Sequence, residues 1–262
     1  MKFSDVMSAV PASENGGSML VSGGWLQGRT LFGGLSAAIA LEAVLKQFPD
    51  LPPIRTAQIT FVGPLGGNCE VRTTVLRRGK SVVTIRSEVF GEYGVGTSCI
   101  FVFGASRPSM FDQSFIPMPN VPSVELSENY ITDECVLKPD FISYFDCLLA
   151  QGERPIRSND VYQHYMWAKH KDELAKGPSA ILAIADMPAP ALASAMPKLA
   201  MMSTITWMLN FVQDQLDTDD GWWLVETKAE NGKDGYSSEN THIWNSEGEI
   251  VVTARQNVAV FI

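Results

Sequence analysis

The segment of the chain that decides the fold reads GGLSAAIALEAVLKQF, from Gly33 to Phe48. Two glycines open it, a nearly unbroken helix-forming run follows, and Pro49 ends it. Apolar residues fall on almost every side of such a helix, which is typical of a helix that is buried on most of its faces. We therefore expect a central helix here, with the rest of this half of the chain packed around it.

Four strand-like runs follow this helix, and each of them ends at a turn signal. Gly63-Pro64 closes the first run, RRGK at residues 77–80 closes the second, and GEYG at residues 91–94 closes the third. Runs of this kind with turns at regular intervals predict an antiparallel meander. The expected strands cover Ile54–Val62, Cys69–Leu76, Ser81–Phe90 and Gly96–Phe103.

The second half of the chain repeats this order of elements. An apolar segment from Gly177 to Pro197 carries a single charge, Asp186, and its first part, Ser179–Asp186, predicts a second buried helix ahead of a proline-rich tail. Hairpin turns are expected at residues 231–233 (NGK) and 246–248 (SEG). The strands expected before and after this helix cover Val161–Lys169, Met201–Val212, Trp222–Glu230, Tyr236–Trp244 and Glu249–Ile262.

A proline-rich stretch separates the two halves. Six prolines fall between residues 105 and 155, where the apolar periodicity is lost except for short helical turns expected around Phe141–Leu149. We therefore expect an N-terminal unit at residues 1–106, a linker at 107–155 and a C-terminal unit at 156–262.

The fold class follows from this repeated arrangement. A long antiparallel sheet with one buried helix is packed most economically by wrapping around that helix. The sequence therefore predicts an α+β fold with two antiparallel sheets, each wrapped around a central helix. Duplication would let the two sheets pair into one larger layer and so remove an exposed edge.

The composition bounds the partners and the compartment. Hydrophobic residues make up 45% of the 262 residues and the net charge is −9, so the chain can bury a sizeable core and lacks the basic footprint of a nucleic-acid-binding protein. The N-terminus has no uninterrupted apolar stretch, and prolines interrupt Gly177–Pro197, so we expect neither a signal peptide nor a membrane span. Four cysteines without a CxxC spacing and three histidines favour a cytoplasmic protein without a metal site.

Two polar residues stand where apolar ones are expected. Asp186 would have a raised pKa if it were buried, which suits a general base; alternatively it faces solvent and ends its helix before Pro188. Gln256 alternates with Ala254 and Val258 on the apolar side of the last strand. Its amide could hold a water or polarise a carbonyl, or it could bond a neighbouring backbone group.

Hydroxyl and backbone groups supply further candidates. Strict alternation in Met201–Phe211 places Ser203 on the same face as Trp207 and Thr204 on the other face, and either hydroxyl could orient a water. Gly33 and Gly34 could offer backbone amides to a carbonyl or oxyanion at a helix N-terminus, or could simply allow close packing of helix on strand.

Four motifs together carry a family resemblance. They are RTLFGG at residues 29–34, AIAD at 183–186, STIT at 203–206 and VTARQ at 252–256. With them the chain resembles the TesB-like, or type II, acyl-CoA thioesterases, which have a double hotdog fold. The resemblance implies that Asp186, Thr204 and Gln256 bind and activate one water. Ser203 stays an alternative for the middle position, and counting strand positions back from Trp207 would give Met202 instead.

The resemblance implies an enzyme of lipid metabolism that hydrolyses a fatty acyl-CoA to the free acid and CoA. CoA would be part of the substrate, no other cofactor would be needed, and the protein would be a homo-oligomer. A basic cluster that includes Arg77, Arg78 and Lys80 could contact the CoA phosphates, or could be solvated strand charges. The alternatives are a hotdog hydratase or dehydratase, which would pair a histidine with a carboxylate, and a non-catalytic acyl-CoA-binding protein.

Overall fold

The computed structural model describes residues 1–12, 16–21, 23–133, 135 and 138–261. Its three α-helices are α1 (Phe3–Ala9), α2 (Gly33–Gln47) and α3 (Gly177–Ala185). Short 3-10 helices occur at η1 (Gly23–Trp25), η2 (Val124–Leu126), η3 (Asp140–Tyr144) and η4 (Ala191–Ala195), and β2 (Leu26–Gln27) pairs with β3 (Thr30–Leu31) in a small hairpin. None of the described helices is long and apolar enough to cross a membrane.

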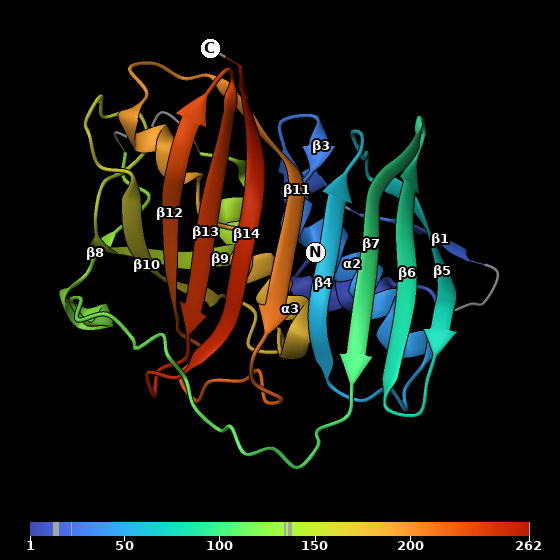
Figure 1. The fold of residues 1–262 in the computed structure, drawn as a ribbon. Helices are drawn as coiled ribbons and strands as arrows, with labels where there is room; N and C mark the ends of the chain where they lie inside the picture. The colour runs from blue at the N-terminus through green and yellow to red at the C-terminus, as the bar shows by residue number, and fades with distance from the viewer. Residues whose placement is uncertain (13–15, 22, 134, 136–137, 262) are drawn as a thin grey trace.

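Twelve strands form one antiparallel sheet (Figure 1). In chain order they are β1 (Gly17–Leu20), β4 (Ile54–Phe61), β5 (Asn68–Arg78), β6 (Val82–Gly91), β7 (Gly94–Gly104), β8 (Glu128–Asn129), β9 (Phe145–Gln151), β10 (Gln163–His170), β11 (Met201–Phe211), β12 (Trp223–Lys233), β13 (Tyr236–Trp244) and β14 (Ile250–Phe261). Across the sheet their order is β1-β5-β6-β7-β4-β11-β14-β13-β12-β10-β9-β8. The strands expected from the sequence are confirmed, with ends that differ by at most three residues; Ile262, the expected end of the last strand, lies outside the described residues. Of the twelve strands, β1, β8 and β9 were not predicted, and neither was α1.

The two sheets expected from the sequence pair edge to edge into this single sheet, as the duplication argument allowed. β4 of the first half pairs with β11 of the second, from Thr60 opposite Thr206 to Thr56 opposite Asn210. This pairing satisfies the backbone groups of both strands, which would otherwise form exposed edges. The two halves are therefore continuous through their hydrogen bonds.

Both central helices lie on the same face of the sheet, behind the strands in Figure 1. α2 packs against β5, β6 and β7 and against α3, and Leu35, Ile39 and Leu41 along it are fully buried. α3 in turn packs against β10. The two helices expected from their unbroken apolar composition are confirmed, and α2 is buried on most sides as predicted.

The predicted linker is only partly a linker. Helical turns expected around Phe141–Leu149 are confirmed by η3, but they end at Tyr144, and Phe145–Gln151 forms β9, which pairs with β10. Alternate burial along FDCLLAQ explains this, because Phe145, Cys147 and Leu149 all face the core. The boundaries of the two units at residues 106 and 156 stay a prediction.

One hairpin turn also lies elsewhere than expected. β12 continues through residues 231–233, and the turn falls on Asp234 and Gly235, whose φ angles are 54° and 80°. Two successive residues with positive φ are what a two-residue hairpin turn requires, and Asp-Gly is among the pairs that adopt it best. The expected turn at residues 246–248 is confirmed, with Gly248 at a φ of 84°.

Candidate active site

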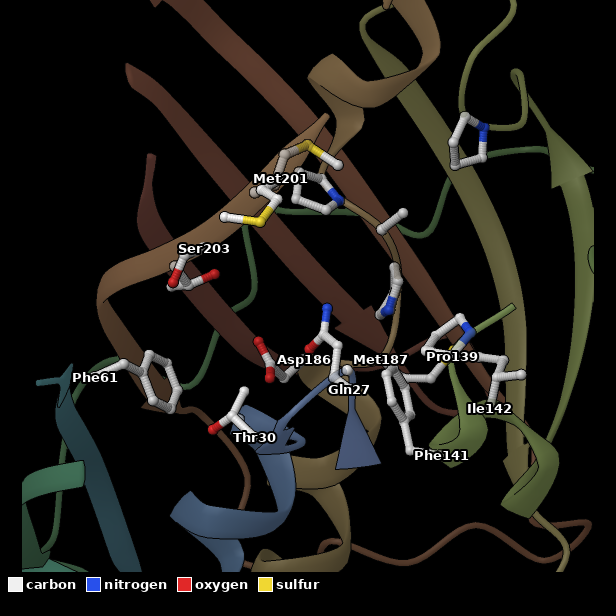
Figure 2. Close-up of a pocket in the computed structure, with 18 of the residues that line it drawn as sticks. Gln27, Thr30, Phe61, Pro139, Phe141, Ile142, Asp186, Met187, Met201 and Ser203 are labelled. Atoms are coloured by element: carbon white, nitrogen blue, oxygen red, sulfur yellow. The ribbon is translucent and has the colours of Figure 1, made fainter. Parts of the chain in front are cut away.

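A cavity of about 880 Å³ opens where the two halves meet (Figure 2). Its wall comes from the residues that lead into α2, from the ends of β4, β11 and β14, from the segment after α3, and from residues between Tyr130 and Arg157. This volume lies in the range of pockets that enclose small-molecule ligands. The cavity therefore collects residues that are far apart in the sequence, from both halves of the sheet.

Asp186 brings the only carboxylate to this cavity among the described lining residues. It is the C-terminal cap of α3, partly buried, and Figure 2 shows its carboxylate pointing into the space between Thr30, Phe61 and Ser203. Burial raises the pKa of Asp186 to about 7. A hydrogen bond from the backbone of Gly34 lowers this pKa, but its effect is smaller than that of burial. Near neutral pH the carboxyl is therefore divided between its two protonation states, as a general base should be.

The two glycines at the start of α2 make room for this carboxylate. A Cβ atom on Gly33 would lie 2.7 Å from Asp186 Oδ2, and one on Gly34 would lie 2.9 Å from Asp186 Cβ. The close packing expected for the pair is therefore observed, against Asp186, and Gly34 also bonds the carboxylate through its backbone; binding of a substrate carbonyl by these amides stays a prediction. Gly33 lines the cavity.

A β-bulge in β11 decides which hydroxyl faces the cavity with Gln256. Thr204 lies opposite Val258 of β14, Thr206 lies opposite Asn257, and the register shifts between them. Thr204 therefore shares a face with Trp207 and Gln256, and strict alternation, which put Ser203 there, is wrong at this point. Thr204 Oγ1 donates to Gln256 Oε1 over 3.3 Å, and both residues line the cavity.

Ser203 and Met202 also line the cavity. Ser203 lies opposite Ala259, on the other side of β11 from Thr204, and is largely exposed. Met202 lies opposite Val260 and packs with Met196 and Val258 in a small apolar cluster. The geometry thus groups the Thr204 hydroxyl, rather than that of Ser203, with Gln256.

The predicted basic cluster lies away from the cavity. Arg78 stands over the ring of Phe48 at 5.8 Å, near the C-terminal end of α2, whereas Gly33 is at its N-terminal end. The 15 residues of α2 separate these ends by roughly 22 Å. Arg77, Arg78 and Lys80 are exposed, and none of them is among the described residues that line the cavity.

Other arginines line the cavity instead. Arg29 and Arg157 are exposed there, and Arg154 is partly buried. Arg29 was not predicted as a site residue, although it is the first residue of the RTLFGG motif and could have been found from it. Arg154, Tyr130 and Phe141 come from the stretch that was predicted as a linker, and no sequence pattern singled them out.

None of the three histidines is among the described residues that line the cavity, and two of them bond elsewhere in the fold. His170 Nε2 is 3.0 Å from the carbonyl oxygen of Ala180, and His242 Nδ1 is 2.6 Å from Glu226 Oε2. His164 is buried on β10. No histidine is among the described residues of the cavity wall, and no group of three or more His, Cys, Asp or Glu side chains in the described part of the chain could hold a metal ion.

Comparison with known structures identifies the fold. A hotdog-fold protein of unknown function from Alicyclobacillus acidocaldarius superposes with a TM-score of 0.86 at 18% identity, over 98% of each chain. A TesB protein of Mycobacterium avium subsp. paratuberculosis gives 0.79 at 13% identity over 100% of both chains. The acyl-CoA thioesterase II TesB2 of Mycobacterium marinum gives 0.76 at 16% identity, over 99% of this chain and 98% of the other.

Comparison with protein families gives the assignment. A search of curated proteins found no match. Residues 21–104 match the model of the acyl-CoA thioesterase N-terminal domain, and residues 116–260 match the model of the acyl-CoA thioesterase C-terminal domain. With matches to both domains, in order and over most of its length, the chain belongs to the acyl-CoA thioesterase family.

Proposed function

We propose that this protein hydrolyses a fatty acyl-CoA to the free acid and CoA by means of one activated water, in a double hotdog in which each half contributes its central helix. The single observation that carries this proposal is a carboxylate with a pKa of about 7 in a cavity that also holds the Thr204–Gln256 pair. Asp186 is the base, and Thr204 and Gln256 hold the water.

The hydrogen bond between Thr204 and Gln256 supports a separate role for the amide nitrogen and for the hydroxyl oxygen. Because Gln256 Oε1 accepts from the threonine hydroxyl, the amide nitrogen is left to donate to a water or to the thioester carbonyl. The threonine hydroxyl oxygen remains available as an acceptor for the water. The pair therefore offers both a donor and an acceptor in the same cavity as the carboxylate.

The reaction then proceeds in two steps. Asp186 takes a proton as the water oxygen attacks the thioester carbon, and the carbonyl electrons move onto oxygen. Gln256 and the backbone amide of Gly33, in the first turn of α2 where amides lack intrahelical partners, stabilise that oxyanion. The carbonyl re-forms, the C–S bond breaks, and the CoA thiolate takes the proton from Asp186. Thiolates leave readily, so one carboxylate is chemically sufficient.

The exposed guanidinium of Arg29 beside the cavity is a better candidate for the CoA phosphates than the basic cluster at the far end of α2. A hydratase or dehydratase mechanism would need a histidine near Asp186, and the described wall of the cavity offers none. A cytoplasmic location and a homo-oligomeric state stay predictions.

The test is thiol release from a panel of acyl-CoAs with saturated chains of increasing length and aromatic groups. Asp186→Asn should lower kcat/KM by about 10²- to 10⁴-fold. The matched control is Asp219→Asn, at an exposed aspartate, which should retain full activity. Tight binding of acyl-CoA without turnover by the wild type would favour the non-catalytic binding protein.

A further inference from the structure

A residue of the cavity wall, Tyr130, carries a buried hydroxyl that the proposed mechanism does not use. Tyr130 lies directly after β8, lines the cavity and is only 5% exposed. Its Oη has no hydrogen-bond partner among the described residues. Buried polar groups in proteins are nearly always paired, so an unpaired one in a cavity wall points to a ligand or a bound water.

The side chain next to Tyr130, His164, also carries a polar atom without a partner among the described residues. The ring of His164 is centred 6.3 Å from the ring of Tyr130, and His164 Nε2 likewise has no partner in the described part of the structure. His164 is 3% exposed, and burial lowers its pKa to about 4, so its ring is neutral at physiological pH. Two neighbouring side chains in the interior thus each carry a polar atom without a partner in the described part of the chain.

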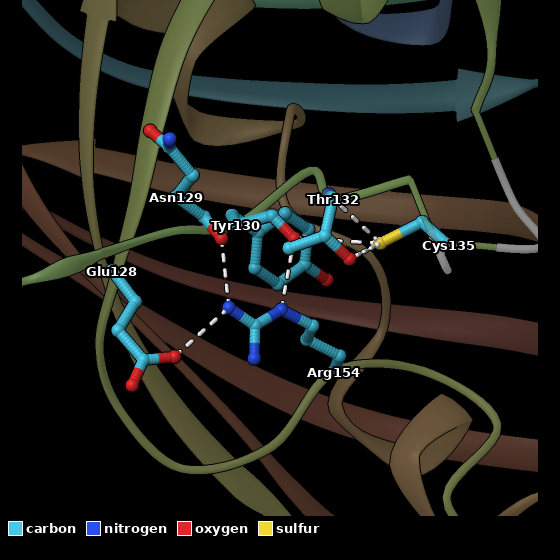
Figure 3. A network of polar contacts seen from close by, with 6 residues as sticks. All are labelled: Glu128, Asn129, Tyr130, Thr132, Cys135 and Arg154. Carbon is cyan, nitrogen blue, oxygen red and sulfur yellow. Dashed lines mark hydrogen bonds and ion pairs between the residues drawn. The ribbon is translucent and has the colours of Figure 1, made fainter.

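The backbone around Tyr130 is firmly held (Figure 3). Arg154 donates from Nε to the Tyr130 carbonyl over 3.1 Å and from Nη2 to the Asn129 carbonyl over 2.7 Å, and it pairs with Glu128 at 3.2 Å. The Tyr130 amide donates to the carbonyl of Cys147 over 2.9 Å. Tyr130 is therefore held through its backbone, and its hydroxyl oxygen is left without a partner among the described residues.

The nearby wall of the cavity is apolar. Pro139, Phe141, Ile142 and Met187 lie together on one side of the cavity in Figure 2. Cys147, which accepts from the Tyr130 amide, also contacts Met187 through its sulfur at 3.4 Å. Tyr130 thus brings a hydrogen-bond donor to a surface that otherwise suits an alkyl chain. Burial raises the pKa of Tyr130 well above its usual value, so the phenol stays protonated.

We propose that Tyr130 is a specificity residue whose hydroxyl donates to an oxygen atom carried by the acyl chain, so that hydroxyacyl- and oxoacyl-CoA are preferred over unsubstituted acyl-CoA. The proposal rests on the proposed thioesterase function. A neutral oxygen is the group that fits, because Tyr130 offers a neutral donor and lines the same cavity as Asp186. A site built to bond a substrate oxygen rejects the analogue that lacks it, since its buried donor is then left unpaired.

The experiment compares acyl-CoAs of equal length with and without a hydroxyl or oxo group at successive chain positions. The wild type should favour the oxygenated member of one pair by at least about tenfold in kcat/KM. Tyr130→Phe should bring that ratio close to one by lowering kcat/KM for the oxygenated member of the pair. Tyr162→Phe, at a partly exposed tyrosine outside the cavity wall, is the control and should keep the ratio. Equal kcat/KM for both members of every pair in the wild type would overturn the proposal while the thioesterase function stands.

A melting curve separates recognition from a structural role. Removal of an unpartnered hydroxyl should leave the Tm of Tyr130→Phe unchanged or raised. A lower Tm with an unchanged substrate ratio would show that the hydroxyl binds a structural water, and would overturn the proposal.

Binding to the Asp186→Asn variant, with and without Tyr130→Phe, separates the proposal from the function on which it rests. A preference for the oxygenated compound that disappears with Tyr130→Phe supports the inference even if the wild type hydrolyses nothing. Binding of neither compound would overturn both.

Discussion

Replacement of Asp186 by asparagine should stabilise the fold at pH 8 while it removes the reaction. The carboxyl packs against Gly33 and Gly34, and burial raises its pKa from 3.8 to about 7. At about 1.36 kcal/mol for each pKa unit, a rise of this size corresponds to roughly 4 kcal/mol of destabilisation by the charged form. Solvent reaches Asp186 from the cavity and reduces this penalty, so the expected gain for Asp186→Asn is about 1–3 kcal/mol.

The sign and the pH window follow from the direction of this change in pKa. Below about pH 4 the carboxyl is protonated in both the folded and the unfolded chain, and the penalty is absent. As the pH rises from about 4 towards 7, the unfolded chain releases the proton first, so the free energy of unfolding of the wild type falls relative to that of the variant. Above about pH 7 the difference is constant.

Urea unfolding of the wild type, Asp186→Asn and the exposed control Asp219→Asn at pH 4.5, 6 and 8 measures this difference. The gain for Asp186→Asn should be smallest at pH 4.5 and reach its full value at pH 8, and Asp219→Asn should show no such trend. If Asp186→Asn is destabilised at pH 8, or differs from the wild type equally at every pH, the claim that the charged carboxylate destabilises the folded state is refuted.

Three further predictions concern the same region. The kcat/KM of the wild type should fall about tenfold for each pH unit below the Asp186 pKa of about 7, and a flat profile between pH 5 and 8 would exclude Asp186 as the base. Gly34→Ala should lower activity by about 10- to 100-fold and stability by about 1–3 kcal/mol, because its Cβ would lie 2.9 Å from that of Asp186. The control is Gly23→Ala, whose Cβ would meet open space, and equal activities of the two variants would contradict the packing argument. Glu239→Ala should cost about 1–3 kcal/mol in urea unfolding, because it removes the side chain that accepts two backbone amides at the start of η4 over 2.7 and 3.3 Å; a loss no larger than that of the exposed control Glu92→Ala would argue against this anchor.

Local periodicity predicted most of the elements of this protein. Each apolar helix and each run of strand residues carries its own pattern, because a side chain is buried or exposed according to its place along its own helix or strand. Asp186 stood out as the single charge in an apolar segment, and Gln256 as the amide on the apolar side of the last strand. These two positions were therefore visible before the tertiary structure was known.

The middle member of the proposed water site was not visible in this way. A bulge between Thr204 and Thr206 shifts the register, and it turns Thr204, rather than Ser203, towards Gln256. A bulge adds one residue to one strand relative to its partner, so it exists only in the pairing of β11 with β14. Strict alternation along β11 alone could not contain it.

The sequence by itself determined the helices, most of the strands and the carboxylate that the cavity presents. The pairing of β4 with β11, the place of Tyr130 and Arg154 in the cavity wall and the position of Arg78 at the far end of α2 came from the tertiary structure. The physical reason is that burial patterns are local, whereas strand pairing and the walls of a cavity depend on hydrogen bonds and contacts between segments that are distant in the chain.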